Sequence, residues 1–386
     1  MKTASLSTKH ASADRQNQEE IVREMKHIES LDYINKLVNA LPFIVAVLNR
    51  QRQIVFANYS LMEMMGMNKL FLFYILLVFY CNDSFTQVDK VLYDERPYNL
   101  ETTNGIISGT LCTPVKGRKF DIALIIPGSG PTDRDGNSIM LPGQNNSLQM
   151  LARELAARGI ATMRYDKRGI GESRLPGFKE ETLRFDDYVS DVIQWIDKLE
   201  HDNQFLNTGI IGHSEGSLIG MLAAWKKNVD FYISLAGAGY PADQIIRKQV
   251  ANQPDTLLRE IHAVLDSLVA GNCVDSINPL LTALFRPSVQ PYLISWMKYD
   301  PPNIISRLDA RILIVQGDND LQVDTSNAQR LAAANKNARL EIIKDMNHVL
   351  KITKDDIASN IAAYSNPDLP VAPDLIKIIS SFIKGD

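Results

Sequence analysis

A serine stands at the centre of the pentapeptide Gly212-His213-Ser214-Glu215-Gly216. The strand-like segment 208–211 precedes it, and a helix-forming segment follows it. A serine on such a strand-to-helix turn projects its hydroxyl away from the sheet, and the new helix directs free N–H groups toward it. The turn leaves no room for a side chain two positions before or two positions after the serine, which explains Gly212 and Gly216. The pattern predicts that Ser214 is a nucleophile.

A serine hydroxyl reacts only when a base removes its proton and an acid holds that base in place. The strand-like run 311–315 is followed by Asp318 and Asp320, and the strand-like run 340–343 is followed by His348. If both runs are parallel strands, their carboxyl ends bring these side chains to the same edge of the sheet as the serine. We therefore expect His348 to be the base and one of the two aspartates to be the acid.

The remaining histidines are less suited to act as the base. His213 adjoins Ser214, but neighbouring residues of a strand point to opposite faces, so its ring does not easily reach the hydroxyl. The others lie in the polar N-terminal segment, at the end of a predicted helix or in a predicted cap: His10, His27, His201 and His262.

Attack on a carbonyl creates a negatively charged oxygen, which needs N–H donors already in place. One expected donor is the backbone of Glu215, directly after the nucleophile. The other comes from the loop 127–131 after the predicted strand 121–126, where position favours the N–H of Ser129. A plain flexible turn is the alternative interpretation of that loop.

Strands and helices alternate from about Tyr93 onward, which predicts a mainly parallel sheet covered by helices on both faces. Segment 99–114 is expected to form a hairpin that turns at Asn104-Gly105. Ser147 is expected to cap a helix that runs to Ala157. The segment from 242 to about 302 interrupts the alternation and predicts a helical cap. The other expected strands are 160–165, 231–235, 312–315 and 340–343, and the other expected helices are 185–199 and 375–383.

Residues 93–386 resemble the α/β-hydrolase superfamily, in particular its bacterial esterases and serine aminopeptidase-like hydrolases. The segment Tyr165-Asp166-Lys167-Arg168-Gly169-Ile170-Gly171-Glu172-Ser173 matches the family loop D-x-R-G-x-G-x-S. The resemblance implies a structural role for Arg168, and it selects Asp320 as the acid, three residues after the glycine that ends its strand. The chain departs from the family at Pro127-Gly128, where relatives often carry His-Gly.

The resemblance implies a cofactor-free hydrolase of carboxylic esters (EC 3.1.1.-) that acts on small molecules through an acyl-enzyme. An aminopeptidase or a thioesterase on the same fold is the alternative. A peptidase of this type would need acidic cap residues to hold a free amino terminus, and Asp255, Glu260 and Asp266 are the candidates. The charged loop 132–136 is expected either to contact substrate or to be a solvated turn.

The amino-acid composition argues against several functional classes. The chain has 386 residues, 45% hydrophobic and 22% charged, with a net charge of −4 and no long basic run, so nucleic-acid binding is not expected. Three scattered cysteines without neighbouring histidines suggest neither a metal site nor a disulfide framework. Cys112 and Cys273 are expected to be buried. Nothing in the sequence indicates the oligomeric state.

The N-terminal part has a different character. Residues 1–37 are polar and are expected to be disordered. Residues 38–66 contain two apolar segments, 41–48 and 53–58, that resemble the opening of a PAS sensor domain, although the later strands of such a domain do not follow. A sensor or binding protein with a hydrolase effector is therefore the hypothesis from a different functional class.

Residues 67–87 have the layout of an export signal. Met67-Asn68-Lys69 provides a basic start, 70–81 is an uncharged stretch too short for a comfortable membrane span, and polar residues follow. We expect a secreted or periplasmic hydrolase domain, 88–386, if Met67 is the functional start, and a cytoplasmic protein otherwise. The alternative is that 70–81 is a buried strand or helix of the larger protein.

Overall fold

The structure is a computed structural model that describes residues 46–48, 54–57 and 92–386, except 142, 174 and 355. The chain divides into two units, Met1–Lys90 and Val91–Asp386. In the first unit, β1 (Ala46–Leu48) and β2 (Ile54–Ala57) pair antiparallel. The predicted polar lead, most of the PAS-like segment and the signal-like segment lie outside the described residues.

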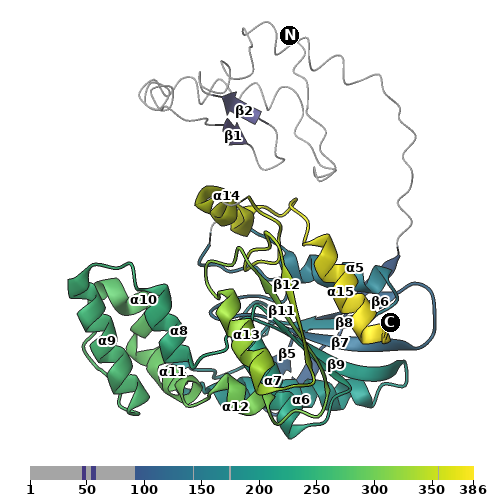
Figure 1. Ribbon diagram of the computed structural model, residues 1–386, viewed down its shortest axis with the longest axis horizontal. Coiled ribbons are helices and arrows are strands. Elements are labelled where there is room, and N and C mark those ends of the chain that lie inside the picture. The colour runs from purple at the N-terminus through teal and green to yellow at the C-terminus, as the bar shows by residue number, and fades with distance from the viewer. Residues whose placement is uncertain (1–45, 49–53, 58–91, 142, 174, 355) are drawn as a thin grey trace, which may run out of the picture. The chain divides into compact units, whose positions relative to one another are not determined.

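An eight-stranded sheet forms the centre of the second unit, in the order β12-β11-β10-β9-β7-β8-β6-β3 (Figure 1). Neighbours from β12 to β8 are parallel, and β6 and β3 add antiparallel strands at one edge. The expected fold class is confirmed. The strands are β3 (Tyr93–Pro97), β6 (Gly109–Pro114), β7 (Phe120–Ile126), β8 (Ala161–Tyr165), β9 (Phe205–His213), β10 (Phe231–Leu235), β11 (Arg311–Gly317) and β12 (Ala338–Ile343).

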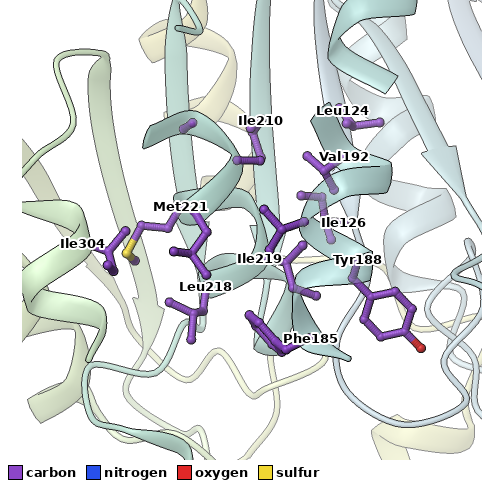
Figure 2. Packing of buried hydrophobic residues seen from close by; sticks show 14 of the residues in the cluster. Leu124, Ile126, Phe185, Tyr188, Val192, Ile210, Leu218, Ile219, Met221 and Ile304 are labelled. Atoms are coloured by element: carbon purple, nitrogen blue, oxygen red, sulfur yellow. The ribbon is translucent and has the colours of Figure 1, made fainter. Parts of the chain in front are cut away.

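Both faces of the sheet are covered because its strands are apolar on both sides. In β7, Ala123 and Ile125 belong to one buried cluster and Leu124 and Ile126 to the other, as the alternation of strand side chains requires. Figure 2 shows Leu124 and Ile126 in the second cluster. Helices α5 (Ser147–Ala157) and α15 (Pro373–Lys384) pack with the first cluster, and α6 (Phe185–Glu200), α7 (Glu215–Lys226) and α13 (Thr325–Ala334) pack with the second.

The segment between β10 and β11 is helical and lies beside the sheet (Figure 1). Aromatic packing joins it to α6, since the rings of Phe185 and Trp296 are parallel to within 2° with centroids 5.8 Å apart. This contact attaches the segment to α6, one of the helices that cover the sheet. It contains α8 (Ala242–Gln249), α9 (Asp255–Val269), α10 (Thr282–Phe285), α11 (Gln290–Met297) and α12 (Pro301–Ile305).

The predicted hairpin is only partly correct. It turns at Asn104-Gly105, where β4 (Leu100–Thr102) pairs with β5 (Gly105–Ile107). Beyond it, β6 leaves the hairpin and joins the main sheet between β3 and β8. The reason is burial: the side chains of β6 that face the core are shielded by the sheet's helices, which a two-stranded ribbon does not provide.

Two smaller expectations were wrong. Asn146, in a left-handed conformation with φ 53°, precedes α5, and Ser147 is the first helical residue instead of its capping side chain. Asn146 makes no capping side-chain bond, and the amide of Ser147 donates instead to Asn145 Oδ1 at 2.9 Å. Cys273 is exposed, because it lies in the turn that follows α9. Among the described residues, no helix is both long and apolar enough to cross a bilayer.

Candidate active site

Ser214 occupies a strained turn between β9 and α7. Its φ of 55° and ψ of −120° are rare for a residue with a side chain. A Cβ added at Gly212 would overlap the carbonyl oxygen of Gly216, and one added at Gly216 would overlap that of Ile126. Both glycines are therefore required by close backbone contacts, and the turn that they permit exposes the Ser214 hydroxyl at the carboxyl edge of the sheet.

His348 and Asp320 come to Ser214 from the loops after β12 and β11. The Ser214 hydroxyl lies 3.1 Å from His348 Nε2, and His348 Nδ1 lies 2.8 Å from Asp320 Oδ2. With the ring proton on Nδ1, that nitrogen donates to the carboxylate and Nε2 accepts from the hydroxyl. His348 is only 4% exposed. The arrangement is that of a nucleophile, a base and an orienting acid in one hydrogen-bonded chain.

The Asp320 carboxylate is held in its charged form. Its Oδ1 accepts from the amides of Gln322 and Val323, at 2.8 and 2.9 Å, and its Oδ2 accepts from the Gln316 side chain at 2.9 Å. Burial favours the neutral acid, but the His348 ring and the two amides outweigh it and hold the pKa of Asp320 below its usual value. The carboxylate is thus able to orient the ring and to stabilise it when it becomes positively charged.

Asp318 has a different partner. Its Oδ1 accepts from the amide of Asp345 at 2.6 Å, which joins the two loops that carry Asp320 and His348. Asp345 has a φ of 59°, so this bond fastens a strained turn. Of the two aspartates, the structure brings Asp320 to the histidine and uses Asp318 to brace the loops.

The two expected oxyanion donors belong to chain segments next to Ser214, the loop after β7 and the first residue of α7. A Cβ built on Gly128 would be 3.2 Å from the Cβ of Ser214, so the loop after β7 passes directly beside the nucleophile. Within the part of the chain that the structure describes, the amides of Ser129 and Glu215 have no hydrogen-bond acceptor in the protein. Two free amides at this place can bind a developing negative charge.

Comparison with known proteins agrees with this architecture. A family model described as serine aminopeptidase, S33, matches residues 143–270, a span that contains Ser214. Esterase EstD of Thermotoga maritima is 23% identical over 278 residues, which span 68% of this chain and 61% of the relative. The probable lysophospholipase L2 of Haemophilus influenzae is 25% identical over 248 residues, 57% of this chain and 78% of the relative. The α/β hydrolase GrgF of Penicillium sp. sh18 superposes with a TM-score of 0.51 and 16% identity, covering 76% of this chain and 98% of GrgF.

The chain therefore has the α/β-hydrolase fold. Within this fold, ion pairs and hydrogen bonds hold the loop D-x-R-G-x-G-x-S. Asp166 accepts from the Arg134 guanidinium at 2.6 Å and from the amide of Glu172 at 2.9 Å. Arg168 makes two bonds to the Asp191 carboxylate, at 2.5 and 2.6 Å. These ion pairs fix the loop against its neighbours.

The side chains of the charged loop 132–136 are also paired within the protein. Arg134 binds Asp166 and Glu172, and Asp135 accepts from Arg164 Nε at 2.8 Å. The Asp133 carboxylate accepts from the amides of its own turn. These bonds favour the interpretation of this loop as a braced turn over that of a substrate contact.

His213 has a contact that the sequence pattern does not indicate. Its Nε2 lies 2.8 Å from the backbone carbonyl of His348 and donates to it. The ring is enclosed in the protein, and this burial, together with the nearby His348 ring, lowers its pKa to about 4. A neutral His213 therefore holds the loop that carries His348. No sequence signal marks this contact, since its partner is a main-chain atom 135 residues away.

Proposed function

We propose that this protein is a serine hydrolase of carboxylic esters in which Ser214 is the nucleophile. The observation that supports it most strongly is the hydrogen-bonded chain from Asp320 through His348 to the hydroxyl of a strained Ser214. Ser214 Oγ attacks the ester carbonyl while His348 Nε2 takes its proton. Asp320 keeps the ring in the required tautomer and stabilises its charged form.

The tetrahedral intermediate then collapses to products. The carbonyl oxygen, now negative, accepts from the amides of Ser129 and Glu215. His348 returns the proton to the alcohol as the carbon–oxygen bond breaks, which leaves an acyl-enzyme on Ser214. Water, deprotonated by His348, attacks that acyl group, and the carboxylic acid departs with Ser214 restored. This sequence of steps requires no cofactor.

The relatives favour an ester as the substrate. One is named an esterase and another a probable lysophospholipase, whereas the family model carries the name of an aminopeptidase. The cap acids that an aminopeptidase would need are exposed on α9, where Asp266 pairs with Arg247 and Glu260 accepts from Asn278. Since two of the three candidates already have partners in the cap, ester hydrolysis is the better-supported activity.

The test compares Ser214→Ala with wild type on nitrophenyl esters of increasing acyl length, aminoacyl anilides and acyl thioesters. We expect esters to be cleaved fastest and the variant to lose kcat on the order of a million-fold, as other triads do. A fluorophosphonate probe should label wild type at Ser214. Ser190→Ala, the same substitution at an exposed position of α6, should leave rates unchanged. More than a few per cent of activity in Ser214→Ala would contradict the assignment of the nucleophile, and faster cleavage of anilides would contradict the substrate class.

A further inference from the structure

Lys167 is a buried lysine that the proposed mechanism does not use. It follows β8 in the D-x-R-G loop and is 1% exposed. Its Nζ donates to the carbonyl oxygen of Gly128 at 2.6 Å and to Glu215 Oε2 at 2.9 Å. A buried ammonium group is costly unless charged and polar partners compensate it. Both compensating partners lie in the segments that provide the oxyanion donors.

The bond to Gly128 sets the direction of one donor. The described residues contain no cis peptide, so in the planar peptide between Gly128 and Ser129 the carbonyl and the N–H point in opposite directions. Lys167 holds the carbonyl oxygen at one edge of this planar peptide. The Ser129 N–H must then point away from the opposite edge. Gly128 itself lies directly beside Ser214.

The bond to Glu215 holds the other donor. Glu215 contributes its backbone N–H to the oxyanion site and its side chain to Lys167, and that side chain is 2% exposed. The remaining carboxylate oxygen, Oε1, accepts from the Tyr292 hydroxyl of α11 at 2.6 Å. The Lys167 ammonium also lies 5.0 Å from the centre of the Tyr188 ring. One buried group therefore connects both donor segments, and through Glu215 it reaches the helical segment between β10 and β11.

We propose that Lys167 is a positioning residue that aligns the two N–H donors of the oxyanion hole. Tyr292 fastens Glu215, and with it this arrangement, to the helical segment between β10 and β11. This proposal rests on the proposed function of Ser214 and its donors. Preorganised donors act because they need no rearrangement when charge develops. Lys167 never touches the substrate in this scheme. Its contribution appears only in the stabilisation of the transition state.

The first experiment replaces Lys167 with Met, which is unbranched and only one atom shorter, and which removes the charge. We expect kcat for a nitrophenyl ester to fall on the order of 100-fold with little change in KM, as when an oxyanion donor is lost. A trifluoromethyl ketone that forms a tetrahedral adduct with Ser214 should bind more weakly by a similar factor. Leu199→Ala, a core truncation on α6, controls for general destabilisation and should leave kcat unchanged. Unchanged binding of the ketone by Lys167→Met would overturn the proposal.

The second experiment separates the alignment of the oxyanion donors from the stability that the Lys167–Glu215 ion pair provides. Lys167→Met alone leaves the Glu215 carboxylate buried without its cation, which is strongly destabilising. The double variant Lys167→Met/Glu215→Gln removes both charges and keeps an acceptor for Tyr292. We expect it to recover most of the lost melting temperature and none of the lost kcat, because the Gly128 carbonyl still lacks its donor. Recovery of kcat together with stability would overturn the proposal and leave Lys167 a purely structural role.

A failure of the positioning role of Lys167 can be told apart from a failure of the proposed function by the activity of Ser214→Ala. If Ser214→Ala keeps its activity, the nucleophile is wrong and the positioning role fails with it. If Ser214→Ala is inactive while Lys167→Met has the kcat of wild type, the triad assignment stands and the positioning role alone is overturned.

Discussion

At the residue scale, the two aspartates after β11 have different partners and should have different effects on the rate. Asp320→Asn keeps the size of the side chain but removes the charge that orients His348, so we expect kcat to fall about a thousand-fold or more. Asp318→Asn should change kcat little, because its oxygen can still accept from Asp345. Steady-state kinetics on one ester would decide the matter. A large loss in Asp318→Asn with a small loss in Asp320→Asn would reverse the assignment.

His213 should make the stability of the protein depend on pH. Burial lowers its pKa from 6.5 to about 4, so between these values the unfolded chain binds a proton that the folded protein does not. The free energy of unfolding is therefore highest above about pH 6.5, and it falls by a few kcal/mol as the pH drops toward 4. The lowered pKa of Asp320 adds a further loss only below 3.8.

The substitution His213→Gln tests this directly. A glutamine amide can still donate to the His348 carbonyl, but it does not titrate. Urea unfolding at a series of pH values should show a flatter dependence for this variant than for wild type between pH 4 and 6.5. Parallel curves for the two proteins would show that His213 does not cause the loss.

At the scale of the elements, the turn between β9 and α7 depends on the absence of a side chain. Gly216→Ala would place a methyl group 2.4 Å from the carbonyl oxygen of Ile126 in β7, a main-chain atom that cannot swing aside as the end of a flexible side chain can. We expect a loss of about 3 kcal/mol or more in the free energy of unfolding. Gly177→Ala, at a φ of 76° with open space around it, carries only conformational strain and should cost about 1–2 kcal/mol. Similar unfolding midpoints for the two variants would contradict the close contact.

At the scale of the whole molecule, we propose that the second unit works alone and that residues 67–87 direct its export. Unit 2, Val91–Asp386, contains the complete candidate site and its own core. Residues 67–386 produced in a bacterium should reach the periplasm and be cleaved near residues 80–87. Cell fractionation and sequencing of the mature N-terminus would measure this.

Residues 88–386 provide the matched control. This shorter chain should stay in the cytoplasm and hydrolyse esters at the full rate, because it lacks only the signal-like segment. An uncleaved, cytoplasmic 67–386 would contradict the export proposal. Activity that requires residues 1–66 would instead favour the sensor hypothesis for the N-terminal part.

The sequence by itself determined the features that depend on local pattern and chain order. Continuous apolar runs predicted the parallel strands, and the two glycines around Ser214 predicted the turn. The order of serine, aspartate and histidine, each placed after a strand, predicted that such side chains meet at the sheet edge, and the family resemblance selected Asp320 over Asp318. These features could be predicted because a strand or a turn is specified by residues a few positions apart.

Only the tertiary structure decided the contacts between distant segments. Lys167 meets a carbonyl 39 residues away and a carboxylate 48 residues away, and nothing in its own motif marks either partner. The same holds for His213, which binds a main-chain atom of His348, and for β6, which joins the sheet instead of its hairpin. The physical reason is that such partners are selected by packing, and packing depends on how all the elements come together in space.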